Sequence, residues 1–278
     1  MSKGISLHLG LNHVNPAHYN GWDGTLNACE ADARDMERIA KSRGLETHSF
    51  LTKAATSKAV IAAIHDAATR VQPGDLFFLT YSGHGGQVPD RNGDEKDRKD
   101  ETWVLFDRQL VDDELYAMWA RFSPGVRIFV LSDSCHSGSV TRDIAEAAVP
   151  HVVAHGMVDT DAPRHKDMPR DVEEATYEAN KELYDEIQKE NPSAEKAMIG
   201  ATVLLISGCQ DNQLSLDGDK NGLFTQQLLS VWNNGRWKGP YRRFQQAIAA
   251  KMPPTQSPNY FKVGASDLDF ERQTPLTV

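Results

Sequence analysis

The feature of this sequence that most limits its fold is a series of short apolar runs separated by amphipathic segments. Residues 76–81, 127–131 and 203–207 form runs of strand length that are almost wholly apolar, as expected of strands buried on both faces of a parallel sheet. Between such runs, apolar residues recur every three or four positions, which is the period of a helix packed on one side. Strands that alternate with helices predict right-handed crossovers, a mainly parallel sheet and helices on both of its faces.

The same patterns place the remaining elements. Two more strands are predicted at 5–11 and 45–51, and helices at 26–43, 57–71, 113–122, 223–232 and 241–251. Ser57 is the expected N-cap of the second helix. Ligands of such sheets bind beyond the carboxyl ends of the strands, so the loops after Tyr81, Leu131 and Ile206 are the places to search for a site.

One segment interrupts the alternation of strands and helices. Residues 141–200 carry no strand signal, are rich in Asp and Glu, and include a highly charged helical stretch at 172–190. We expect a large N-terminal part at 1–140, an acidic helical insertion or linker at 141–200, and a small C-terminal part at 201–278 that completes the same domain. A surface helix of that one domain is the alternative interpretation of the middle segment.

Composition excludes several classes of protein. A chain that is 40% hydrophobic and 25% charged is an ordinary globular protein, and no apolar run approaches the roughly 20 residues that span a bilayer. A net charge of −9 argues against non-specific binding of nucleic acid. Three cysteines cannot form a disulfide framework. With no export signal at the N-terminus, we expect a cytoplasmic protein with a free thiol, without a membrane or nucleic-acid partner.

Two of the expected loops carry reactive groups. The strand at 76–81 leads into a glycine-rich loop with His84, and the strand at 127–131 leads into a Ser- and Asp-rich loop with Cys135. A thiol attacks a peptide carbonyl as the thiolate, so it needs an imidazole nearby, and neighbouring parallel strands would supply one. The glycines beside His84 leave backbone N–H groups that could stabilise an oxyanion. Cys209 follows another apolar strand, and spacing alone does not exclude it as the nucleophile.

These motifs resemble a known family. Tyr81-Ser82-Gly83-His84-Gly85 and Asp133-Ser134-Cys135-His136-Ser137-Gly138 look like the paired catalytic motifs of the caspase-fold cysteine peptidases, in particular the metacaspase branch and its bacterial relatives. The resemblance continues in residues 29–32, 110–115 and 207–211, and covers about 4–140 and 200–235. It implies a caspase-like three-layer α/β/α sandwich and selects Cys135 over Cys209 as the nucleophile.

The resemblance also implies roles for further residues. Metacaspases cleave after Arg or Lys, and carboxylates that match Asp32 and Asp133 line the pocket for the basic side chain, with Ser82 and Cys29 beside them. A buried carboxylate is a suitable partner for a guanidinium or ammonium. The backbone N–H groups of Gly85 and Cys135 would be the oxyanion donors. Without the resemblance, a solvated helix residue is the preferred interpretation of Asp32.

Calcium is a third implication of the resemblance. In many metacaspases, acidic residues that resemble Asp100, Asp112 and Asp113 bind an activating calcium, and hard oxygen ligands suit that ion. A further ligand of the family falls near Arg142-Asp143, where the match is ambiguous. From composition alone, a solvated loop of mixed charge is the simpler interpretation of these acidic residues. No cofactor is expected for the chemistry, and calcium is expected only as an activator.

The resulting hypothesis is a cysteine endopeptidase that hydrolyses peptide bonds after Arg or Lys through Cys135 and His84. Its partner would be a polypeptide with basic residues, and we expect a monomer. The basic residues of the middle segment (Arg164, Lys166 and Arg170) are candidate self-cleavage sites. A caspase-like scaffold that binds partners without cutting is the main alternative. A nucleotide-binding protein is disfavoured, because the first strand is followed by no phosphate-binding glycine motif.

Overall fold

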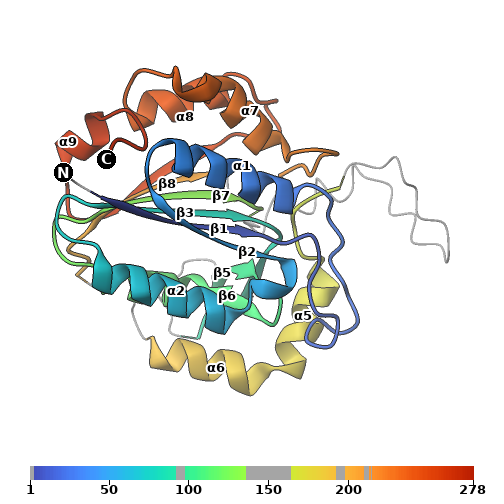
Figure 1. The fold of residues 1–278 in the computed structure, drawn as a ribbon. Helices are drawn as coiled ribbons and strands as arrows, with labels where there is room; N and C mark the ends of the chain where they lie inside the picture. The colour runs from blue at the N-terminus through green and yellow to red at the C-terminus, as the bar shows by residue number, and fades with distance from the viewer. Residues whose placement is uncertain (1–2, 92–97, 136–163, 192–197, 210–212, 214) are drawn as a thin grey trace.

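The computed structural model describes residues 3–91, 98–135, 164–191, 198–209, 213 and 215–278. Within these ranges no helix is both long and apolar enough to cross a bilayer. The molecule is built around one six-stranded sheet with helices on both sides, and it has a second sheet of three strands (Figure 1).

The main sheet confirms the predicted fold class. In spatial order its strands are β2 (Glu46–Leu51), β1 (Gly4–Gly10), β3 (Leu76–Ser82), β7 (Arg127–Asp133), β8 (Thr202–Ser207) and β9 (Asn259–Gly264). All neighbours are parallel except β9, which runs antiparallel to β8 at the edge. In the register of β3 and β7, Ser82 lies opposite Asp133. The loops that follow these two central strands therefore start side by side.

Helices cover both faces of the sheet. On one face lie α1 (Cys29–Ser42), α7 (Leu223–Trp232) and α8 (Tyr241–Ala249), with the short α9 (Leu268–Arg272) beyond them (Figure 1). On the other face lie α2 (Ser57–Arg70) and α3 (Asp112–Trp119). Two short 3-10 helices, η1 (Thr52–Ala54) and η3 (Asn233–Gly235), complete the connections. These three layers are the α/β/α sandwich expected from the sequence.

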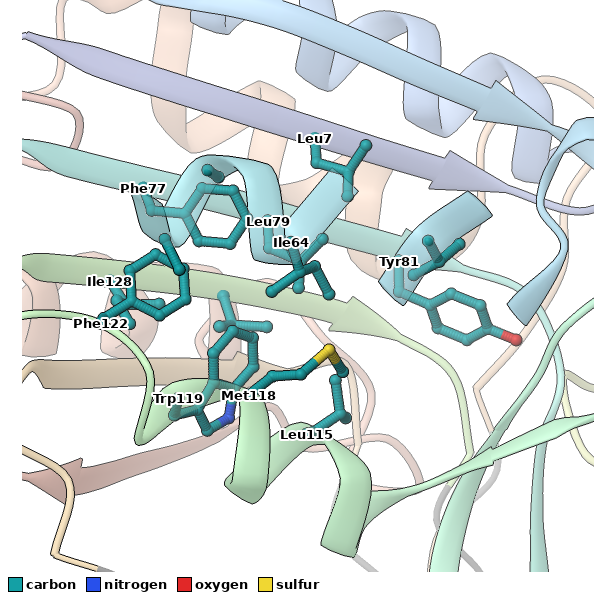
Figure 2. Close-up of a cluster of buried hydrophobic side chains, with 14 of the residues drawn as sticks. Leu7, Ile64, Phe77, Leu79, Tyr81, Leu115, Met118, Trp119, Phe122 and Ile128 are labelled. Atoms are coloured by element: carbon teal, nitrogen blue, oxygen red, sulfur yellow. The ribbon is translucent and has the colours of Figure 1, made fainter. Parts of the chain in front are cut away.

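A continuous apolar core holds the two central strands in place. Figure 2 shows Phe77 and Leu79 of β3 and Ile128 of β7 facing Ile64 of α2 and the apolar side of α3. The rings of Phe77 and Phe122 stack with centroids 5.2 Å apart. Because both strands are buried along their whole length, their carboxyl ends form a rigid platform for the loops above.

The second, smaller sheet was not predicted from the sequence. It consists of β4 (Gly85–Pro89), β5 (Lys99–Val104) and β6 (Gln109–Val111), all antiparallel. Its first strand starts directly after His84, so it fixes the glycine-rich loop. Two helices, α5 (Arg170–Ala179) and α6 (Lys181–Glu190), pack on this sheet through a cluster that includes Tyr177 and Tyr184.

Two details differ from the sequence-based expectations. The charged helical stretch at 172–190 is two helices separated at Asn180. The N-cap of α2 is Thr56 and not Ser57, since the Thr56 side chain accepts a hydrogen bond from the Ala59 N–H. Ser57 instead donates its backbone and hydroxyl hydrogen bonds to the Asp107 carboxylate. The prediction that residues 141–200 form an insertion stays a prediction.

Candidate active site

The two predicted loops meet at the carboxyl end of the sheet. His84 follows β3 and Cys135 follows β7, and both side chains are buried. Gly85 lies so close to Cys135 that a Cβ atom there would collide with the Cys135 carbonyl oxygen. Only glycine permits this approach, so the glycine after His84 brings the two loops together.

The imidazole of His84 is held by backbone carbonyls. Its Nε2 lies 3.0 Å from the Gly24 oxygen and its Nδ1 lies 3.1 Å from the Asp167 oxygen. The Trp22 ring covers it at a centroid distance of 4.7 Å. Burial lowers the pKa of His84 and outweighs the two carbonyls, which favour the charged ring. A neutral imidazole carries one N–H, so only one of these two carbonyls can accept a hydrogen bond from it at a time.

The thiol of Cys135 has a different set of contacts. The Ser215 N–H donates to Sγ at 2.7 Å, and no hydrogen bond between the described atoms joins this thiol to the His84 ring. Burial, together with the neighbouring Cys209 thiol, raises the pKa of Cys135 well above its usual value. In this arrangement the predicted nucleophile is a protonated, covered thiol.

The site is covered by the chain itself. Residues 164–168, called the strap below, run through it between two other chain segments, with a bend at Lys166. One side of the strap pairs with the start of β4, where Gly85 and Asp167 form a parallel bridge, and the other pairs antiparallel with Leu216 through His165. The Lys166 N–H donates to the Ser215 carbonyl at 2.9 Å. A peptide bound between two chain segments in this way resembles a substrate added as a strand.

The carbonyl of Lys166 accepts two hydrogen bonds from the predicted oxyanion donors. The Gly85 N–H lies 3.0 Å from this oxygen and the Cys135 N–H lies 3.1 Å from it. Both distances fall in the range in which backbone donors stabilise a developing oxyanion. One carbonyl oxygen of the strap therefore lies between the two predicted oxyanion donors.

The side chain of Lys166 fills an acidic pocket. Its ammonium nitrogen lies 3.1 Å from Asp32 and 3.1 Å from Asp133, and it donates to the Ser82 hydroxyl at 3.0 Å. Lys166 is wholly buried. Although burial works against the ammonium, the carboxylates of Asp133 and Asp32 hold the pKa of Lys166 well above its usual value.

Other donors fix the two carboxylates. Asp133 accepts from the hydroxyls of Ser215 at 2.7 Å and Thr225 at 2.8 Å. Asp32 accepts from the Gly222 N–H at 3.0 Å and from the Asn221 amide at 3.0 Å. With these bonds made, neither anion can turn away, so the pocket is preorganised for one cationic group.

The remaining predicted pocket residue, Cys29, lies beside the acidic pocket. It starts α1, and its thiol interacts with the Ser82 side chain. Burial raises the pKa of Cys29 to about 12. The structure thus brings Cys29, Asp32, Ser82 and Asp133 together around one basic side chain, although they come from α1, β3 and β7.

The rival thiol has a structural position. Cys209 follows β8, is wholly buried, and donates to the Ser134 carbonyl at 3.2 Å. No strap carbonyl accepts a hydrogen bond from its N–H among the described contacts, whereas the Cys135 N–H donates to one. The backbone geometry therefore favours Cys135, as the resemblance did.

The predicted calcium residues lie apart from this pocket. Asp100 is buried in β5, and Asp112 and Asp113 start α3. Over the described ranges, no group of three or more His, Cys, Asp or Glu side chains is arranged to hold a metal ion. Arg142-Asp143 lies outside the described residues. Calcium activation therefore stays a prediction, and no step below uses it.

Sequence reasoning missed several residues of the site. Lys166 was only one of three candidate basic residues, and Ser215, Gly222 and Thr225 were not assigned to the site. Gly222 forms the floor of the acidic pocket, where a Cβ atom would collide with the Lys166 ammonium and lie 2.7 Å from Asp133. A glycine that directly precedes the apolar helix α7 was the one signal that could have identified it.

A thiol and an imidazole on neighbouring strand ends, with two N–H donors aimed at one carbonyl, are the groups of a cysteine-type peptidase. The family model described as "Caspase domain" matches residues 13–270, so the chain belongs to that family. Related proteins include Metacaspase-1 of Mycosarcoma maydis, 29% identical over 83% of this chain, and Metacaspase-1A of Aspergillus oryzae, 30% identical over 87%. The chain spans 63% and 62% of the lengths of these two relatives.

Two solved structures are similar to this one. A protein of Geobacter sulfurreducens is 52% identical and covers 99% of both chains with a TM-score of 0.90. Caspase-1 of Spodoptera frugiperda is only 10% identical, and it covers 95% of this chain and 86% of its own with a TM-score of 0.54. The second likeness concerns the fold alone and confirms the caspase-like sandwich.

Proposed function

We propose that this chain is a cysteine endopeptidase that hydrolyses polypeptides after Lys or Arg, with Cys135 as nucleophile and His84 as general base. The observation that carries the proposal is the position of Lys166. Its ammonium group occupies the acidic pocket while its carbonyl oxygen accepts from Gly85 and Cys135. One residue thus occupies the pocket and the oxyanion site at the same time, as the residue before a cleaved bond would.

The chemistry requires one ring nitrogen of His84 to turn from its carbonyl partner toward the Cys135 thiol. His84 takes the thiol proton, and the Cys135 sulfur attacks the carbonyl carbon, whose oxygen becomes negative between the two N–H donors. The protonated imidazole gives its proton to the leaving amine, and a thioester remains on Cys135. His84 then activates a water that hydrolyses the thioester and restores the thiol.

Two carboxylates around one ammonium support selection of a basic residue. Removing the cation would leave two buried carboxylates without a positively charged partner, so a neutral side chain is a poor occupant. Arg suits the same pocket, because its planar guanidinium can donate to both carboxylates. Acidic side chains are excluded by repulsion.

The first experiment compares fluorogenic amides that end in Arg, Lys, Asp or Leu before the reporter. We expect wild-type protein to cleave only the Arg and Lys reporters, and Cys135→Ala and His84→Ala to cleave neither. Each assay is run with calcium and with a chelator, which tests the calcium prediction at the same time. Equal cleavage by Cys135→Ala would refute the assignment of the nucleophile.

A scaffold that binds partners without cutting is the alternative, and the covered, protonated thiol is the observation that favours it. Labelling with a basic-residue chloromethylketone separates the two functions. A peptidase alkylates Cys135, and a prior excess of the Arg reporter slows the labelling. A folded protein that never labels and never cleaves would be a scaffold.

A further inference from the structure

The strap has a second buried side chain, on the far side of the bond between Lys166 and Asp167. Along the strap, burial alternates, with Lys166 and Met168 buried and His165 and Asp167 partly exposed. The strap bends at Lys166, and the side chains of Lys166 and Met168 are buried among different sets of residues on either side of Asp167. Met168 is wholly excluded from solvent, although it lies only two residues from the acidic pocket.

The pocket around Met168 is apolar. Its side chain packs with Val14, Tyr19 and Val104, and the partly buried Trp22 and Val172 close the cluster. Gly86 of β4 also lies beside Met168. A Cβ atom added to Gly86 would lie 3.4 Å from the Met168 Cβ atom. Four of the five lining residues come from outside the strap and the helix that follows it.

Those walls are built without the strap. The Tyr19 hydroxyl donates to the Leu105 carbonyl at 2.6 Å, and the Val14 N–H donates to the Asp23 carbonyl at 2.8 Å. Val104 is anchored by its N–H to the His84 carbonyl at 3.0 Å. The pocket is therefore a fixed part of the loop after β1 and of the end of β5.

The backbone of the strap places Met168 in a defined register. The Met168 N–H donates to the Gly85 carbonyl at 2.8 Å, while the Gly85 N–H donates to the Lys166 carbonyl. One glycine thus fixes both the carbonyl that would be attacked and the residue two positions beyond the bond. A polypeptide bound in the same register must place its own second residue after the bond against this pocket.

From these contacts we infer that the Met168 pocket is a second specificity site, which receives a large apolar side chain two residues after the cleaved bond of a polypeptide substrate. The inference rests on the proposed function and adds to it a recognition element on the leaving-group side. The preferred sequence is a basic residue, then a small or polar residue that stays partly exposed, then Met, Leu or a similar apolar residue.

The test uses a matched pair of peptides that differ at one position. Both carry Lys-Ala after a common leader, followed by Leu in one and Asn in the other. We expect kcat/KM to be at least about tenfold higher for the Leu peptide, since burial of an apolar side chain of this size contributes that much or more. Equal values for the two peptides would overturn the inference.

A Lys reporter with a fluorophore directly after the Lys separates this inference from the proposed function, since it has no second residue. Cleavage of the reporter with equal cleavage of both peptides contradicts only the pocket. If the reporter is cut and neither peptide is cut, the inference about the pocket is also contradicted. Met168 would then keep the pocket closed to substrates. If the reporter is not cut either, the peptidase assignment fails and the pocket with it.

A second measurement uses the strap as the substrate. Met168→Leu keeps an apolar side chain at this position. Met168→Asn replaces it with a polar side chain that has the same number of heavy atoms as Leu. We expect the Asn variant to release the fragment that starts at Asp167 at least about tenfold more slowly than the Leu variant. Thermal unfolding shows whether each variant is folded, and a folded Asn variant that cleaves at the Leu rate would contradict the inference.

Discussion

The ammonium nitrogen of Lys166 lies 3.1 Å from a carboxylate oxygen of Asp133, with both side chains almost wholly excluded from solvent. Asp133→Asn removes one of the two carboxylates around this ammonium, while Asp32 stays 3.1 Å from it. We therefore predict that Asp133→Asn lowers the free energy of unfolding by about 1.5–3 kcal/mol, the contribution of a hydrogen bond to a charged group. Urea denaturation in the Cys135→Ala background, where the chain stays intact, measures the loss.

A double-mutant cycle of Asp133→Asn with Lys166→Met isolates the pair itself, and we expect a coupling of about 1–3 kcal/mol. The surface pair of Lys262 and Glu271 is the matched control. Its nitrogen–oxygen distance is 2.9 Å, but the Lys262 side chain is 37% exposed. Lys262→Met should change stability by less than about 1 kcal/mol. No coupling between Asp133 and Lys166 would mean that the buried pair does not form in solution.

Self-cleavage is the second prediction. Purified wild-type chain should yield one fragment that ends at Lys166 and one that begins at Asp167, identified by intact mass and N-terminal sequencing. Cys135→Ala and Lys166→Met should stay whole, because one lacks the nucleophile and the other lacks the charge for the acidic pocket. Arg164→Met and Arg170→Met are the controls and should still be cut after Lys166. Cleavage after Arg164 or Arg170 in wild type would place the strap in another register.

The third prediction concerns the floor of the acidic pocket. Gly222→Ala adds one carbon in the space of the ammonium, so basic side chains no longer reach both carboxylates. We expect kcat/KM for an Arg reporter to fall roughly a hundredfold, as for other displacements of this size in an active site. The backbone of Gly222 has φ −57° and ψ 149°, which alanine adopts without strain. Full activity of a correctly folded Gly222→Ala protein would remove Gly222 from the pocket.

The fourth prediction is a pH dependence of stability. His8 in β1 is buried between the hydroxyls of Thr80 and Ser6, and burial lowers its pKa to about 3. The unfolded chain binds a proton at His8 below about pH 6.5, and the folded chain does not. The stabilisation from neutral His8 is therefore present above pH 6.5 and is lost as the pH falls toward 3.

The measurement for this prediction is the free energy of unfolding between pH 7 and 4, for the Cys135→Ala protein with and without His8→Gln. Gln cannot be protonated. The free energy of unfolding of the variant should therefore fall less steeply with decreasing pH, by about 1.4 kcal/mol per pH unit. His84, also buried with a lowered pKa, should keep a similar slope in both proteins. Identical slopes would show that His8 is protonated in the folded state.

Much of the main sheet was predictable because its strands are buried on both faces and are therefore continuous apolar runs. The small sheet was not, since β4 contains two glycines and a proline and β5 begins with Lys99, Asp100 and Glu101. These strands are defined by their pairing with each other and with α5 and α6. All residues of the edge strand β9 are partly or fully exposed. Its sequence therefore carries no core pattern that could have predicted it.

The site was predictable to the extent that strand ends define it. Cys135 and His84 follow two apolar strands, so topology alone brings their loops together. The strap could not be predicted in this way, because Lys166 and Met168 lie in a segment without strand periodicity and become buried only by pairing with Gly85 and Ser215. Their burial depends on tertiary contacts that no local pattern encodes.

The strap is part of the same chain as the pocket that it fills, and this has a consequence for any added ligand. A tethered segment acts at a local concentration on the order of millimolar, whatever the concentration of the protein. Dilution therefore does not empty the pocket. A free basic peptide competes against that local concentration, so affinities measured on the intact chain will understate how strongly the acidic pocket binds a cation once the strap has been cut.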